Sequence, residues 1–171
     1  MTLFMAVVTM PLLTSCGEDD KEGNGGNGNG GDTTGITGAY TGKINVMNLG
    51  EGPNDVVAVL ARTGDKYSLL LKDLNVDLGV IVGAPGAIAI PDVTIPNVTF
   101  GNGILGGGDT QSIPVTLPDF LAEGFGGITE IEVEVIFNNG AVSGNNLTFN
   151  LGIALPTEEP WVIPVAFNGN K

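Results

Sequence analysis

ITEIEVEVIFNNGAVSGNNLTFNLGIAL, residues 128–155, carries the clearest structural signal in the chain. Between 128 and 137 glutamates alternate with Ile and Val, and a period of two is typical of a half-buried β-strand. Asn138-Asn139-Gly140 and Ser143-Gly144-Asn145-Asn146 supply turn residues before a second apolar run at 147–155. The segment therefore predicts strands over 128–137 and 147–155, with one turn at 138–140 and another leading into the second strand.

Short apolar runs separated by turn residues recur on both sides of this segment. Arg62-Thr63-Gly64-Asp65 has the composition of a hairpin turn. Pro96 and Pro114 predict bulges or sheet edges, because proline cannot donate to a strand ladder. Residues 118–123 (PDFLAE) predict a single helical turn. The remaining strands are predicted at 36–46, 55–61, 66–74, 92–100, 111–117 and 161–167.

These strands, about eight in all and mostly joined as hairpins, predict an all-β fold. Closing an antiparallel up-and-down sheet of this size into a β-barrel hides its edges completely. A β-sandwich is the alternative, since two packed sheets also bury one face of every strand. A barrel of this size has room for packed side chains or for one small ligand.

The composition excludes several functions. The chain of 171 residues has 19 acidic and 6 basic side chains, no histidine and one cysteine. Without histidine there is no Ser-His-Asp or Cys-His catalysis and no histidine-based metal site of the usual kind. One thiol forms no internal disulfide, and a net charge of −13 opposes binding to phosphate backbones. We therefore expect no catalytic residues, no metal, no cofactor and no nucleic-acid partner, and we expect the protein not to be an enzyme.

The N-terminal segment has the anatomy of an export signal. Residues 3–13 (LFMAVVTMPLL) are almost continuously apolar but too short for a membrane span, which needs about 20 residues. Leu13-Thr14-Ser15-Cys16 follows and resembles the bacterial lipobox, whose cysteine becomes the lipid-modified first residue of the mature chain. We therefore predict a signal peptide over 1–15, lipidation at Cys16 and attachment to a membrane through that lipid.

A tether is predicted between the cysteine and the folded domain. Residues 17–22 (GEDDKE) resemble the acidic tether of outer-leaflet lipoproteins in Bacteroidetes, and a simple solvated spacer is the alternative. Residues 23–31 contain only Gly and Asn, which is typical of a flexible linker. The predicted organisation is a lipidated tether over 16–35 and a single barrel domain over 36–171. Its predicted location is the outer membrane, exposed at the cell surface, with a periplasm-facing position as the alternative.

Three carboxylates share one face of a predicted strand. Glu130, Glu132 and Glu134 alternate with apolar residues, and such a row normally faces water on the side opposite the core. A cation site is the alternative, since hard cations bind carboxylate oxygens. Residues two apart on a strand lie about 6–7 Å apart, so one ion would also need ligands from loops. The pattern favours a solvated face.

Two further acidic pairs were considered for acid–base chemistry. Glu158 and Glu159 lie close to Trp161, and paired acids with an aromatic ring are typical of glycosidases. Adjacent residues in a turn usually diverge, and no opposing acid is marked in the sequence. Asp73 and Asp77 meet the same objection, so neither pair is predicted to be catalytic.

Residues 78–91 (LGVIVGAPGAIAIP) form an apolar run interrupted by Gly and Pro. We interpret this run as a buried strand pair with a turn at Ala84-Pro85-Gly86. The alternative is an apolar lip at the mouth of the barrel, to which Phe120, Leu121 and Phe125 would also belong. A ligand or a partner protein could bind at such a lip.

Five segments share a pattern with one known family. They are GAYTGKINV (38–46), DKYSLLLKDLNV (65–76), IPVTLPDF (113–120), NNGAVSGNNLTFNLGIAL (138–155) and IPVAFNG (163–169). Together they resemble the calycin-like lipoproteins of Bacteroidetes, over nearly all of residues 36–171. The resemblance implies an eight-stranded, lipocalin-like barrel and assigns Cys16 as the point of lipid attachment. It brings no binding residues, so the ligand-binding residues are not predicted.

Two functions follow from these expectations. The first is a cell-envelope lipoprotein whose barrel binds a small apolar or nutrient-derived ligand. The alternative is a non-catalytic surface interaction or structural module without an internal ligand, whose protein partners the sequence does not identify. A barrel interior fully packed with side chains would contradict the first function. The second function gains if the interior is filled and a contiguous apolar patch is exposed on the outside.

Overall fold

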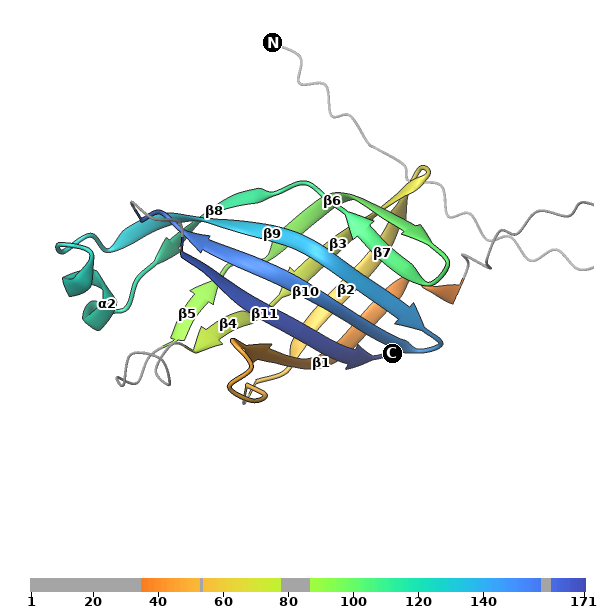
Figure 1. Ribbon diagram of the computed structural model, residues 1–171, viewed down its shortest axis with the longest axis horizontal. Coiled ribbons are helices and arrows are strands. Elements are labelled where there is room, and N and C mark those ends of the chain that lie inside the picture. The colour runs from red at the N-terminus through yellow and green to blue at the C-terminus, as the bar shows by residue number, and fades with distance from the viewer. Residues whose placement is uncertain (1–34, 53, 78–86, 158–160) are drawn as a thin grey trace, which may run out of the picture.

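The computed structural model describes residues 35–52, 54–77, 87–157 and 161–171 (Figure 1). These residues form eleven β-strands and one short helix. The elements are β1 (Gly38–Val46), β2 (Val56–Thr63), β3 (Lys66–Lys72), β4 (Leu74–Asp77), β5 (Ala87–Ile90), β6 (Val93–Gly101), β7 (Ile104–Gly107), β8 (Gln111–Thr116), α2 (Asp119–Gly124), β9 (Glu130–Ser143), β10 (Asn146–Leu155) and β11 (Trp161–Asn170).

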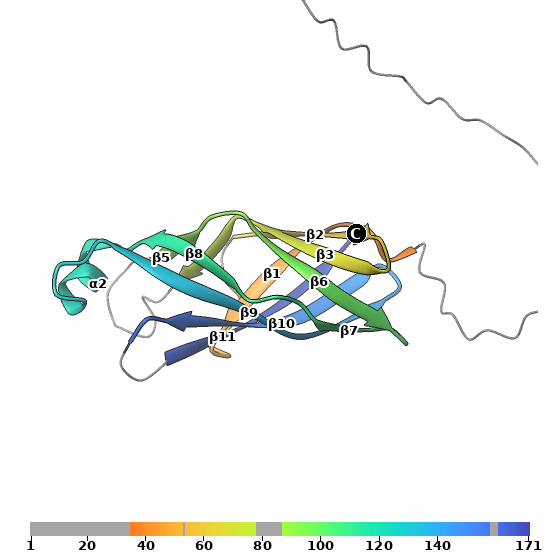
Figure 2. The same ribbon diagram turned by 90° about the horizontal axis from the view of Figure 1, so that it is seen from above.

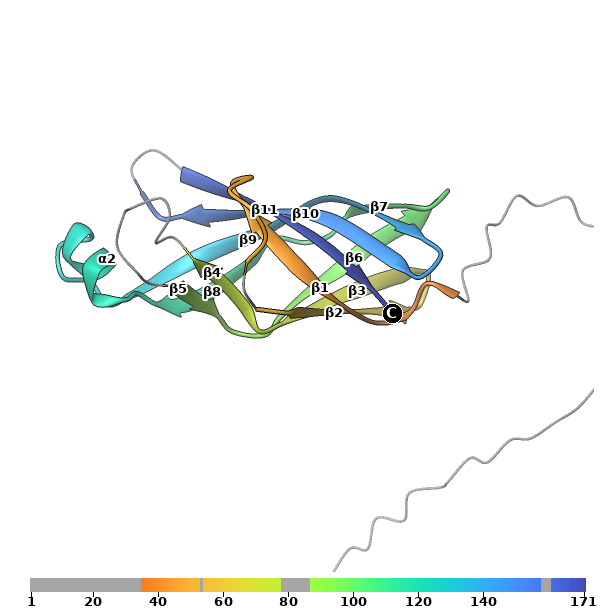
Figure 3. The ribbon, with the colours of Figure 1, turned by 90° about the horizontal axis from the view of Figure 1, so that it is seen from below.

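Eight of the strands form a closed antiparallel ring. Their order is β10-β11-β1-β2-β3-β6-β7-β9, and pairing of β9 with β10 closes the ring. Figures 2 and 3 show β2 and β3 on one side of the barrel and β10 and β11 on the other. The predicted all-β, eight-stranded, antiparallel up-and-down barrel is therefore confirmed, and the β-sandwich alternative is wrong.

Two of the additional strands extend one hairpin of the ring. β3 pairs with β6, and β4 pairs with β5 in a separate two-stranded sheet. The register is continuous, because Leu71 lies opposite Val93 and Leu74 lies opposite Ile90. Asp73, with φ +58°, interrupts this long hairpin, so the single strand predicted over 66–74 is divided there.

The third additional strand, β8, continues β7 along β9. Leu105 of β7 lies opposite Gly140, and Gln111 of β8 lies opposite Val135. The sequence analysis did not predict β7, although Asn102-Gly103 marks its hairpin. Both residues have positive φ, as a type I′ turn requires. Pro114 lies in β8 at the end of the sheet order, as predicted for an edge. Pro96 lies where the pairing of β3 with β6 shifts, as predicted for a bulge.

The predicted turn at Asn138-Asn139-Gly140 is wrong, because β9 runs through it from Glu130 to Ser143. The register against β10 shifts by one residue at this point, where Asn150 pairs with Asn139 and Leu151 pairs with Phe137. This bulge changes the inward-facing positions of β9 from odd to even numbers, so Phe137 and Val142 are both buried. The chain reverses later, at Gly144-Asn145, which was the second predicted turn.

The two ends of the barrel differ. Two-residue turns at Gly64-Asp65, Asn102-Gly103 and Gly144-Asn145 lie at one end, here called the closed end. The opposite end, here called the open end, carries the longer connections, the β4–β5 hairpin and α2 (Figure 1). The predicted helical turn over 118–123 is thus confirmed as α2.

The barrel interior is filled by apolar side chains from all its strands. Tyr40, Leu69, Ile95, Val133 and Ile163 have no exposed surface, and a void large enough for water would leave the side chains around it accessible. The Phe149 and Phe167 rings stack with their centroids 4.6 Å apart. No polar or charged residue is buried in the described part of the chain. The centre of the barrel is therefore a packed core with no space for a ligand.

Tyr40 links the packed core to the two ends of the described chain. Its hydroxyl donates a 2.5 Å hydrogen bond to the Ile36 carbonyl, and the Lys171 ammonium lies 5.0 Å from its ring centroid. Lys171 also donates from Nζ to the Gly35 carbonyl and from its backbone N–H to the Asn145 carbonyl. These contacts hold the first described residues, Gly35 and Ile36, and the C-terminal Lys171 at the closed end of the barrel.

We expect Tyr40→Phe to lower the free energy of unfolding by about 1 kcal/mol at neutral pH, because the buried Ile36 carbonyl loses its donor. Burial raises the pKa of Tyr40, so the folded state keeps the phenol neutral. The free energy of unfolding of the native protein should therefore decrease as pH rises above about 10, where the phenol of Tyr40 ionises in the unfolded chain but not in the folded one. Urea denaturation at several pH values measures both effects, and an equal alkaline loss in Tyr40→Phe would contradict the second.

Gly42 and Gly169 pair across β1 and β11, and neither position has room for a side chain. A Cβ on Gly42 would overlap the Asn168 carbonyl oxygen and the Gly169 Cα. We expect Gly42→Ala to lower the free energy of unfolding by roughly 2–3 kcal/mol through overpacking. Gly101→Ala is the control, because its Cβ meets no atom within 4 Å, and it should change stability by less than about 0.5 kcal/mol.

Candidate functional site

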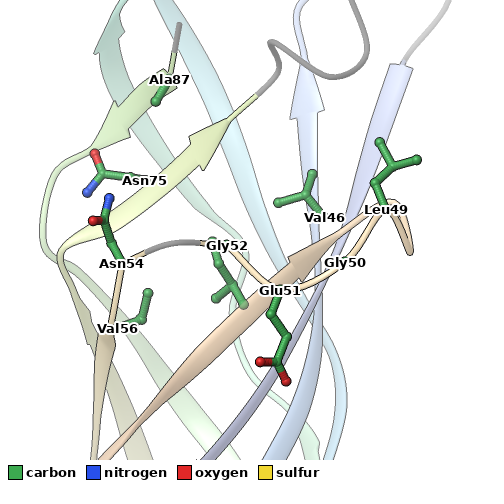
Figure 4. A pocket seen from close by; sticks show the side chains of 10 residues that line it. Val46, Leu49, Gly50, Glu51, Gly52, Asn54, Val56, Asn75 and Ala87 are labelled. Carbon is green, nitrogen blue, oxygen red and sulfur yellow. The ribbon is translucent and has the colours of Figure 1, made fainter. Parts of the chain in front are cut away.

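A pocket of about 190 Å³ lies at the open end of the barrel. It is formed where the β1–β2 connection approaches the β4–β5 hairpin (Figure 4). Its described lining is Ile44, Val46, Leu49, Gly50, Glu51, Gly52, Asn54, Val56, Asn75 and Ala87.

The floor of the pocket is an extension of the barrel core. Ile44, Val46 and Val56 occupy inward positions on β1 and β2 and are buried. The same core continues into the β4–β5 hairpin, where Leu74, Val76, Ile88 and Ile90 are buried, although β4 and β5 are not hydrogen-bonded to the large sheet in the described structure. The described residues therefore leave a pocket at the open end that has this buried apolar floor.

The β1–β2 connection forms one wall in an unusual backbone conformation. Met47 and Asn48 have φ values of +51° and +59°, and positive φ is uncommon for residues other than glycine. The Met47 N–H donates to the Pro164 carbonyl at 2.9 Å, and the Gly52 N–H donates to the Ile44 carbonyl at 2.7 Å. Backbone strain of this kind costs on the order of 1–3 kcal/mol and often occurs at ligand clamps.

Polar groups lie on the opposite side. Asn54 and Asn75 lie next to each other across the pocket from Val46 and Leu49, and the Glu51 carboxylate points away from both asparagines (Figure 4). The Asn75 side chain donates to the Asp73 carbonyl at 3.1 Å, which restricts its orientation. The site therefore combines an apolar floor with amide groups at one side, the usual composition of a small-molecule pocket.

The size and charge of the pocket limit what it can hold. An apolar cavity of about 150 Å³ accommodates benzene, so about 190 Å³ suits a single ring or a branched aliphatic group. The described lining includes one carboxylate and no Lys or Arg, so an anionic ligand would meet no opposite charge. The same lining contains no pair of acids or nucleophile with a base, so it suits binding rather than catalysis.

Large apolar side chains are exposed near this pocket. Leu49 is 55% exposed, and Trp161 and Val162 at the start of β11 are 39% and 44% exposed. The hydrogen bond between Met47 and Pro164 holds the β1–β2 connection beside this part of β11. We call Leu49, Trp161 and Val162 the apolar rim.

None of the predicted acidic candidates in the described part of the chain lines the pocket, although Asp73 and Asp77 flank the lining residue Asn75 on the chain. Glu130, Glu132 and Glu134 are exposed on the outer face of β9, as the alternation predicted, and the Ser112 hydroxyl donates to Glu132 at 2.5 Å. Asp73 is exposed at the interruption between β3 and β4, and Asp77 ends β4. Within the described ranges no three His, Cys, Asp or Glu residues are grouped so as to hold a metal ion.

Several predicted features fall on residues that the structure does not describe. These are Cys16, Glu158, Glu159 and the proposed turn at Ala84-Pro85-Gly86. No helix in the described part of the chain combines the length and apolar character needed to cross a membrane.

The predicted apolar lip is only partly related to the pocket. Within 78–91, the described residues form β4's partner β5, with Ile88 and Ile90 buried and Ala87 lining the pocket. Phe120, Leu121 and Phe125 lie on and beside α2, half-buried, and do not line it.

The sequence analysis missed the β1–β2 connection as a site. The segment MNLGEG (47–52) could have indicated it, because Leu49 is a large apolar residue within a sequence typical of a turn, where polar residues and glycine are expected. Asn54 and Asn75 gave no comparable signal, because asparagine is common in turns for local backbone reasons.

Comparisons with known proteins assign no family. No family model matches the sequence, and no curated protein matches it. Among solved structures, a candidate outer membrane protein of Bacteroides fragilis aligns with a TM-score of 0.44 and 15% identity. The alignment covers 80% of this chain and 51% of the other, so the chain spans about half the length of that protein. At this level of similarity the match carries no conclusion about function.

Proposed function

We propose that the chain is a lipid-anchored, non-catalytic protein of the bacterial cell envelope that binds a small, mainly apolar, uncharged molecule. The observation that carries the proposal is the pocket at the open end, with its apolar floor and its two adjacent amides. Because the centre of the barrel is packed, the ligand binds at the mouth and not in the lumen. The barrel then acts as a rigid support for the β1–β2 connection.

The first described residues show where a lipid anchor would join the barrel. Gly35 lies at the closed end, since Lys171 contacts both its carbonyl and the carbonyl of Asn145 in the β9–β10 turn. A lipid on Cys16 would therefore be connected to the closed end through the predicted flexible linker.

A second function is favoured by the apolar rim. Leu49, Trp161 and Val162 are exposed on the same end as the pocket, and exposed apolar groups that gather in one place often mark a protein–protein contact. In that case the protein is a non-catalytic interaction module, and the pocket receives a side chain of the partner instead of a free molecule.

The lipid anchor is tested by Cys16→Ser. In a bacterial host fed with labelled palmitate, we expect the native precursor to carry label and to sediment with membranes. Cys16→Ser should lose the label and leave the membrane fraction. Ser15→Ala is the control, because it keeps a small residue before the cysteine and should behave as the native chain does. Label retained by Cys16→Ser would contradict lipidation at this residue.

Ligand binding is tested by blocking the pocket at Gly52. A Cβ on Gly52 lies 3.6 Å from Ile44 Cγ1, in ordinary contact, so a leucine there extends into the pocket without a backbone clash. We expect p-cresol and benzyl alcohol to shift the methyl resonances of Val46 and Val56. Gly52→Leu should raise the dissociation constant of each probe at least tenfold. Benzoate, which is anionic, should bind less well than benzyl alcohol.

Gly101→Leu provides the control for this substitution, because it adds the same side chain at the closed end, where a Cβ meets no atom within 4 Å. Its binding of the two probes should equal that of the native protein. No methyl shift with either probe, or equal binding by Gly52→Leu, would refute the pocket as a ligand site and favour the interaction module.

A further inference from the structure

Apart from the pocket, the barrel carries a polar surface of unusual composition on the outside of β9, β10 and β11. Asn139, Asn146, Asn150, Asn168 and Asn170 occupy outward positions toward the closed end, and we call them the asparagine face. In Figure 1 these antiparallel strands lie side by side and extend to the end of the barrel where the C-terminus lies. Strand pairing brings the residues together, since Asn146 lies opposite Asn170 and Asn150 lies opposite Asn139.

The amides of this face are already ordered by one another. Asn146 Nδ2 donates to Asn168 Oδ1 at 2.9 Å and to Asn170 Oδ1 at 3.2 Å, and Asn150 Nδ2 donates to Asn139 Oδ1 at 2.8 Å. Each amide has two donors and an acceptor with two lone pairs, so these bonds leave further groups available to solvent. Binding of a ligand to the face therefore costs less side-chain conformational entropy than binding to freely rotating amides would.

The strands that carry this face contain few charged side chains, although Lys43 of β1, which is ion-paired with Asp55, lies opposite Asn168 and Lys171 follows Asn170. Residues 36–171 contain 14 acidic and 5 basic side chains, yet residues 135–157 and 161–170 contain none of either sign. The carboxylates on β9, at Glu130, Glu132 and Glu134, lie toward the other end of that strand. On β9 the carboxylates thus lie toward the open end and the amides toward the closed end.

We propose that the asparagine face binds neutral glycans. A hydroxyl group both donates and accepts hydrogen bonds, as an amide does, so a polyhydroxylated chain can pair with the free donors and acceptors together. Protein partners need an apolar centre, and nucleic acids need clustered cations, and the face offers neither. The face has no aromatic ring that could stack on a sugar, so one protein molecule binds with low affinity. Several protein molecules on one polysaccharide, or on one cell surface, bind with higher avidity.

The test is affinity electrophoresis of the native protein in gels that contain dextran, mannan or β-glucan. We expect retardation by at least one of these neutral polysaccharides and none by alginate, which is anionic. The triple variant Asn146→Val, Asn150→Val and Asn168→Val should lose at least four fifths of the retardation. Valine suits exposed strand positions and leaves the net charge, and so the mobility in a plain gel, unchanged.

Two control variants make the result specific. Ser68→Val, Thr94→Val and Thr116→Val together remove three polar groups from the outer faces of β3, β6 and β8, and this variant should be retarded like the native protein. Gly52→Leu should also be retarded normally, which separates this surface from the pocket. The proposal is overturned if no neutral polysaccharide retards the native protein, or if the asparagine variant is retarded as strongly as the native protein.

Discussion

The pairing of β9 with β10 is the interaction that closes the barrel. It runs from Ser143 opposite Asn146 to Glu134 opposite Ala154, with one bulge between. Without this ladder the remaining strands would form an open sheet with two long unpaired edges, which favour aggregation. Closure turns one face of every strand in the ring toward a common interior, so the burial of the apolar residues depends on it.

The packed interior determines where the protein can interact with other molecules. Tyr40, Phe149 and Phe167 fill the closed half of the barrel, so no ligand fits there. Toward the open end the β4–β5 hairpin is not hydrogen-bonded to the large sheet, and the described residues leave a pocket there above the buried Ile44, Val46 and Val56. The pocket is therefore a consequence of incomplete pairing at one end, combined with a strained connection that lies over it.

Most of the fold could be predicted from the alternation of apolar and polar residues. The strand over 128–137, the hairpin at Gly64-Asp65 and the helical turn over 118–123 all follow from local composition. The turn predicted at 138–140 failed because Asn and Gly are common both in turns and in bulges, and only the partner strand distinguishes the two. β7 was missed because it is short, although Asn102-Gly103 is a strong hairpin signal.

The fold class, the inward positions of most strands and the net charge follow from the amino-acid sequence, because they depend on residue type and a period of two. The pocket does not follow from it, because it is formed by elements that are distant in the sequence. Asn75 and Ala87 of the β4–β5 hairpin meet the β1–β2 connection at the pocket, and no local sequence pattern records that contact. The asparagine face has the same origin, since Asn139, Asn150 and Asn168 become neighbours only through the register of three strands.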